Sequence, residues 1–181
     1  MNGDVLMYIV PPDVEVIEVG FRETGYPTEF AGTFSCDDPF LNDYWEKAVR
    51  TMYVNMRDSY FDCPDRERAQ WFGDIVNDLN TAFYCFDRNA DQLAIKGYLE
   101  LVNWQKPDGV LYHPVPCSNY FKELPMQLMN VVGWYGLRNL WFYSGDSSFV
   151  EDVYEPVHRY LHEVWQLDSE GLPIYRVGDW D

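Results

Sequence analysis

The residues best suited to chemistry lie together in one short segment of the chain. Residues 62–74 read DCPDRERAQWFGD and hold four carboxylates and two arginines in 13 residues. Glycoside hydrolysis uses such a mixture, because one carboxylic acid protonates the leaving oxygen while neighbouring groups hold the sugar and shift the pKa of that acid. Nearby carboxylates raise this pKa and adjacent arginines lower it, so composition leaves the sign of the net shift open. The same residues also fit a solvated, self-paired turn that caps a helix, with Asp74 as the cap.

The element before this segment is predicted to be a long amphipathic helix. Asp38 is a favourable N-cap, and Pro39 suits the first helical position. Apolar residues then recur at steps of three and four through residues 40–56, which predicts a broad apolar stripe on one face. The residue before Pro64 is restricted to extended backbone, so the helix has ended where the charged segment begins.

Four more helices are predicted after the segment, each from apolar residues that recur at helical spacing. Residues 106–123 contain three prolines and separate the third helix from the fourth as a long loop. Helices joined alternately by short and long connections indicate successive α-hairpins, and so a mainly α fold with about five helices. The expected helices cover residues 74–87, 90–104 and 125–145, and a last stretch from about residue 147 to before Gly171 that is kinked at Pro156.

The first 35 residues differ from the rest and are predicted to be β-strands. Apolar and polar residues alternate over residues 14–21, with a change of phase at Val16-Ile17 that suggests a bulge. Two or three strands cannot form a stable sheet alone. We therefore divide the chain into residues 1–35, the tail of an upstream β-domain such as a β-sandwich, and residues 36–181, the helical part.

Composition narrows the class of partner. The chain has 181 residues, a net charge of −17 and 18% aromatic residues. This charge argues against nucleic acid and anionic membrane surfaces, which both need Lys and Arg patches, and the sequence has no run of 18 apolar residues that could span a bilayer. Aromatic rings and carboxylates together suit carbohydrate. The four cysteines have no CxxC spacing, and His158 and His162 lack a third ligand, so neither a metal nor another cofactor is predicted.

The segment DCPDRERAQWFGD resembles the D-C-P-x-R-(D)-E-R-x-x-W-x-G-D signature of bacterial alpha-L-rhamnosidases. Residues 30–61 look like the linker and first barrel helix of that family, and EPVHRYLHEVW and the final GDWD look like later barrel segments. The resemblance implies an inverting glycoside hydrolase built on an (α/α)6 toroid behind β-domains. One departure is Ala69-Gln70, where many members have a glycine before the tryptophan.

The resemblance also implies roles for single residues. Glu67 matches the general acid of the family, and Arg68 is expected to be structural and to pair with a carboxylate that shapes the loop. Other residues match positions that line the rhamnose pocket, where carboxylates accept sugar hydroxyls and an indole packs on the ring. These residues are Asp62, Arg66, Trp71, Asp74 and, near the end of the chain, Trp180.

The second carboxylate of the reaction has no match in this sequence. An inverting enzyme places a base roughly 6.5–9.5 Å from the acid, and the family supplies it from later in the barrel. We therefore expect this chain to be the first part of a truncated toroid that is inactive alone. We expect it to self-associate or to pair with the missing part of its own barrel.

The complete enzyme would hydrolyse terminal alpha-L-rhamnose from glycosides or polysaccharides. Two alternatives remain: a non-catalytic sugar-binding or assembly fragment, and a related (α/α)6 hydrolase for another sugar. The start of the chain lacks the pattern of a signal peptide. For a fragment this leaves the compartment open, and a periplasmic or secreted location stays compatible with a full-length bacterial enzyme.

Overall fold

The computed structural model describes residues 5–117 and 122–176, and this part of the chain is mainly helical. Two π-helical segments, η1 (Trp134–Arg138) and η2 (Tyr160–Val164), continue α-helices along the chain. Counted with these extensions, the helices of the described residues form five successive segments, in agreement with the predicted number. The α-helices are α1 (Pro39–Val54), α2 (Phe72–Cys85), α3 (Asn89–Asn103), α4 (Pro125–Val132), α5 (Asn139–Ser144) and α6 (Val150–Arg159).

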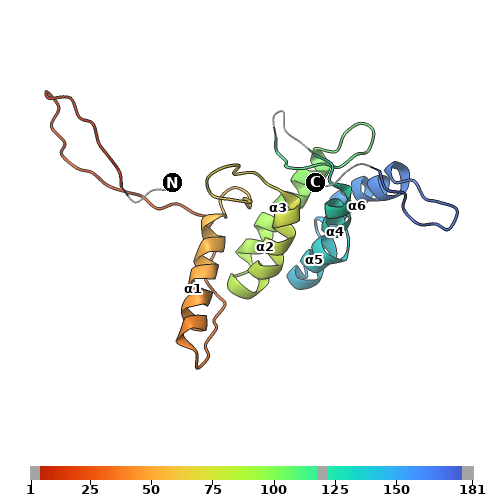
Figure 1. Ribbon diagram of the computed structural model, residues 1–181, viewed down its shortest axis with the longest axis horizontal. Helices are drawn as coiled ribbons and strands as arrows, with labels where there is room; N and C mark the ends of the chain where they lie inside the picture. Colours follow the sequence, from red (N-terminus) through yellow and green to blue (C-terminus); the bar gives the residue numbers. More distant parts are fainter. Residues whose placement is uncertain (1–4, 118–121, 177–181) are drawn as a thin grey trace.

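Helix α1 begins where the sequence predicts. The Asp38 carboxylate accepts a hydrogen bond from the Phe40 amide at 2.9 Å, and Pro39 occupies the first turn. Val49 and Met52 are the buried residues of this helix. Most of its apolar stripe is therefore open to solvent, and α1 stands to one side of the other helices in Figure 1.

The hydrophobic core lies where α2 and α3 pack against each other and against the later helices. Helix α2 contacts α4, η1 and α5, and α3 contacts α5 and α6. Phe72 and Leu79 from α2 meet Leu101 from α3 in this core, and all three are almost fully buried. The Tyr98 hydroxyl donates to the Val131 carbonyl at 2.7 Å, which ties α3 to α4. This packing fixes the start of α2, which directly follows the charged segment.

The ends of the later helices follow local signals. Helix α5 ends at Ser144 because Gly145 adopts a left-handed conformation with φ 65°, which suits glycine. Helix α6 continues through Pro156 to Arg159, so the proline does not end the helix, although it removes one backbone donor. The kink expected at this proline stays a prediction. The chain leaves η2 at Trp165 in an extended conformation.

Residues 5–35 form no strand in the described part of the chain, contrary to the local pattern. They run as an extended chain that Figure 1 shows reaching away from the helices. Contact with the helices begins near Glu23, whose carboxylate pairs with Arg50 of α1. It continues at Tyr26, whose hydroxyl donates to the Asn89 carbonyl at 2.9 Å. Gly32 then donates its amide to the Cys85 carbonyl at 2.9 Å, an approach so close that a Cβ would lie 1.8 Å from the Tyr84 carbonyl oxygen. Short strands need a partner to form a sheet, so their membership of a β-domain stays a prediction.

Candidate active site

The charged segment between α1 and α2 forms a loop, residues 62–71, which we call the acid loop. The Asp62 amide donates to the Ala69 carbonyl at 3.0 Å, and the Ala69 amide donates to Asp62 Oδ1 at 3.0 Å. Inside the loop, the Glu67 amide donates to Cys63 Sγ at 3.2 Å. These bonds close the loop at its two ends and hold the backbone of Glu67 in place.

Arg68 completes the turn of the acid loop. Its φ is 48°, a left-handed conformation that costs a residue with a side chain on the order of 1–3 kcal/mol. Its Nε donates to the Pro64 carbonyl at 2.8 Å, which offsets part of that cost. This contact is structural and is made to backbone, whereas a carboxylate partner was the expectation from sequence.

The Glu67 carboxylate is held by two side chains of the acid loop. Oε2 accepts a hydrogen bond from the indole Nε1 of Trp71 at 2.6 Å. Oε1 forms an ion pair with the Arg66 guanidinium. The Glu67 side chain is 33% exposed and that of Arg66 is 83% exposed. The carboxylate therefore has a fixed orientation, while its arginine partner can move into solvent at little cost.

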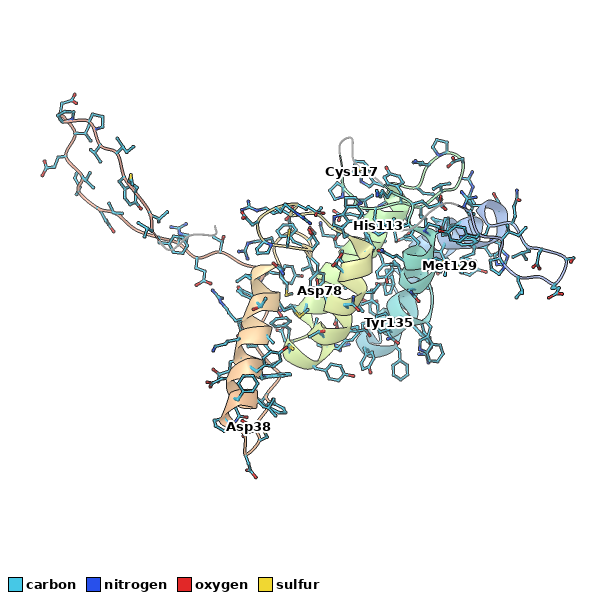
Figure 2. All side chains as sticks on the ribbon, in the orientation of Figure 1. Asp38, Asp78, His113, Cys117, Met129 and Tyr135 are labelled. Carbon is cyan, nitrogen blue, oxygen red and sulfur yellow. The ribbon has the colours of Figure 1, made fainter. Side chains whose placement is uncertain are left out.

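The acid loop lines a cavity of about 1130 Å³ together with the start of α2 and residues 114–117. Cys117, which is labelled in Figure 2, is one of the residues that line it from the second loop. The structure thus brings five residues named from the sequence around one space, namely Asp62, Arg66, Glu67, Trp71 and Asp74. The sixth, Trp180, lies outside the described residues.

Trp71 is fixed by a histidine that the sequence analysis did not single out. The indole is only 4% exposed, and its edge meets the His113 ring with 5.2 Å between centroids. His113 is fully buried, and its Nδ1 accepts a hydrogen bond from the Phe72 amide, the first of α2, at 3.1 Å. Burial lowers the pKa of His113 to about 3, so the ring is neutral near pH 7. His113 therefore positions both Trp71 and the start of α2.

Gln70 attaches the acid loop to the core. Its Nε2 donates to Glu100 Oε2 of α3 at 2.8 Å and to the Val115 carbonyl at 2.7 Å. The side chain is 2% exposed, so both bonds lie away from water. Gln70 stands at the position where this sequence departs from the rhamnosidase pattern, and the contact with a residue 30 positions away has no signal in the sequence.

Asp74 lies within the first turn of α2 and is not the cap of this helix. The helix begins at Phe72, and the Asp74 amide donates to the Trp71 carbonyl at 3.1 Å. Burial raises the pKa of the Asp74 carboxyl, and the charges of Asp62 and Glu67 raise it further. The capping role expected for Asp74 is therefore wrong.

Asp78 follows one turn later on α2 (Figure 2) and is a second carboxylate with a shifted pKa. Burial raises its pKa to about 7, and the charge of Asp74 contributes to this shift. Carboxylates that are buried close together repel each other, so protons are bound more tightly there. The row of carboxylates that starts in the acid loop therefore continues into the protein along α2.

The other two histidines, His158 and His162, do not line the cavity at the acid loop. His158 and His162 are exposed, and their rings stack on each other with 4.3 Å between centroids. Within residues 5–117 and 122–176, no group of three or more His, Cys, Asp or Glu side chains is arranged to hold a metal ion. In the same ranges, no helix combines the length and the apolar character that crossing a bilayer requires.

The helical hairpins and the carboxylate-lined cavity are the features of a glycosidase domain. The family described as the bacterial alpha-L-rhamnosidase six-hairpin glycosidase domain matches residues 29–181 of the chain. The chain belongs to this family, which confirms the resemblance seen in the acid loop. The family is one of glycoside hydrolases, so its substrate is a carbohydrate. No curated protein and no solved structure matches the chain.

Proposed function

We propose that this chain forms the acid side of the active site of an inverting alpha-L-rhamnosidase. The complete enzyme removes terminal alpha-L-rhamnose from glycosides or polysaccharides, and Glu67 is its general acid. The observation that carries this proposal is the placement of the Glu67 carboxylate at the cavity, oriented by the Trp71 indole and surrounded by Asp62, Arg66 and Asp74.

The contacts of Glu67 indicate how it delivers a proton. Oε2 accepts from the Trp71 indole, which can only donate, so the proton of the acid is carried on Oε1. Oε1 faces Arg66 in the free chain. When the hydroxyls of a bound sugar draw the exposed Arg66 away, Oε1 takes up a proton from solvent and is directed at the glycosidic oxygen. Proton transfer to that oxygen then assists cleavage of the bond to the leaving group.

The neighbouring carboxylates fit the recognition of sugar hydroxyls. Asp62 lines the cavity and uses Oδ1 for the Ala69 amide, which leaves Oδ2 as an acceptor. Asp74 also lines the cavity, and burial together with the charges of Asp62 and Glu67 raises its pKa. Trp71 is largely buried and serves Glu67, so its proposed contact with the sugar is limited to the part that reaches the cavity. Trp180 is proposed as a further aromatic contact.

The base that activates water is proposed to come from residues outside this sequence. Inversion requires it roughly 6.5–9.5 Å from the acid on the opposite face of the sugar. We therefore propose that the 181 residues alone bind the rhamnose of a rhamnoside but do not hydrolyse its glycosidic bond.

The test is the stereochemistry of the product. The complete enzyme is mixed with 4-nitrophenyl alpha-L-rhamnoside, and the first rhamnose formed is followed by proton NMR before it mutarotates. The proposal predicts beta-L-rhamnose as the first product and no turnover by the 181-residue chain alone. First formation of alpha-L-rhamnose, or cleavage of another glycoside in preference, would contradict it.

A further inference from the structure

A second cavity of about 370 Å³ adjoins the first along α2. Asp74 lines both cavities, so the two spaces meet at this carboxylate. The walls of the second cavity come from α2, from the start of α4 and from η1, where Tyr135 is labelled in Figure 2. The proposed role of Glu67 makes no use of this cavity, because Glu67 does not line it.

Neutral hydrogen-bonding groups line this second cavity. Besides Asp74 it presents the amides of Asn77, Gln127 and Asn130 and the phenol of Tyr135. The Tyr135 hydroxyl donates to Asn77 Oδ1 at 3.2 Å, which links α2 to η1 across the cavity. Amides both donate and accept, and the phenol adds an aromatic face. This lining suits a hydroxyl-rich, uncharged ligand, whereas a phosphate would need cationic groups.

Gln127 is the group most available to such a ligand. Its side chain is half-buried and makes no hydrogen bond within the described residues. The amide lies directly against Gly73, where an added Cβ would be 2.2 Å from Gln127 Oε1. Gly73 precedes Asp74, so the Gln127 amide lies beside the point where the two cavities meet.

We propose that the second cavity binds the sugar residue next to the rhamnose that is cleaved, with Gln127 as its principal hydrogen-bonding group. The proposal rests on the function proposed above and adds a preference among its substrates. A substrate in which rhamnose is attached to another neutral sugar fills both cavities. An aryl rhamnoside places no hydroxyls in the second cavity.

The test compares two substrates in the complete enzyme. The value of kcat/KM is measured for 4-nitrophenyl alpha-L-rhamnoside and for a disaccharide of alpha-L-rhamnose linked to glucose. In Gln127→Ala, the ratio of the disaccharide value to the aryl value is expected to fall about fivefold, the effect of one lost hydrogen bond. Gln166→Ala is the matched control, because Gln166 is exposed and lies outside both cavities.

The outcomes separate the two proposals. A fall in the ratio in Gln127→Ala, with an unchanged ratio in Gln166→Ala, supports the second subsite. An unchanged ratio in Gln127→Ala, in an enzyme that cleaves the aryl rhamnoside, overturns the subsite and leaves the proposed function standing. A wild-type enzyme that cleaves neither substrate overturns the proposed function, and the subsite with it.

Discussion

Replacement of Asp78 by asparagine is expected to stabilise the protein in a way that depends on pH. Asp78 is the carboxylate on α2 whose pKa burial raises to about 7 from 3.8. Asparagine has nearly the same shape and carries no charge at any pH. The variant therefore removes the cost of ionising this buried group and little else.

The raised pKa sets the sign and the size of the effect. Between pH 3.8 and about 7 the folded protein binds a proton at Asp78 that the unfolded chain has lost, so this group lowers the free energy of unfolding as pH rises. One pKa unit corresponds to about 1.4 kcal/mol, so the full shift is worth about 4 kcal/mol above pH 7. Asp78 keeps partial contact with solvent. We therefore expect Asp78→Asn to gain on the order of 2–4 kcal/mol at pH 8 and almost nothing at pH 4.

The assay is urea unfolding of wild type and variant at fixed protein concentration from pH 4 to pH 8, followed by tryptophan fluorescence. The difference between the two curves isolates Asp78, because the opposite dependence of the neutral His113 is present in both proteins. Asp152→Asn, at an exposed position of α6, is the matched control. A stability difference between Asp78→Asn and wild type that stays constant across this pH range would refute the reasoning.

Three further predictions concern the loops and surfaces. His113→Phe leaves the buried Phe72 amide without an acceptor, so we expect it to lower the free energy of unfolding by about 1–3 kcal/mol in chemical denaturation. His113→Asn keeps an acceptor and should recover part of this loss. Asp62→Ala should weaken rhamnose binding in calorimetry by about 1–3 kcal/mol and more than Asp65→Ala, and the reverse order would remove Asp62 from the site. Apolar side chains such as Phe40 and Trp134 are each 70% exposed, so we expect the isolated chain to self-associate. Sedimentation measures this, and a compact monomer at micromolar concentration would show the prediction to be wrong.

Elements specified by neighbouring residues could be predicted from the sequence. The Asp38 cap with Pro39 locates the start of α1, and Gly145 locates the end of α5, because each acts within one turn of the helix it bounds. The five residues around the first cavity could also be named, because one continuous segment of 13 residues holds all five and resembles the signature of a known family.

Features that depend on contacts between distant residues could not be predicted. Helix α2 starts at Phe72 because its first amide is bound by His113, which lies 41 positions away in a loop. The hydrogen bond from Gln70 to Glu100 likewise joins residues that lie far apart in the sequence, here by 30 positions. The pKa of Asp78 depends on burial, which only the packed helices create. The alternating pattern of residues 14–21 favours a strand, yet a strand forms only where a partner strand is available.

The measurement that tests the central claim most directly is the activity of Glu67→Gln in the complete enzyme on two leaving groups. Glutamine can still accept the Trp71 indole hydrogen bond, but its amide is too weak an acid to transfer a proton to the glycosidic oxygen. With a rhamnoside whose leaving group is a sugar, kcat is predicted to fall about 10²–10⁴-fold. With 4-nitrophenyl alpha-L-rhamnoside, whose leaving group departs without a proton, the fall is predicted to be much smaller. Equal and mild losses on both substrates would contradict the assignment of Glu67 as the general acid.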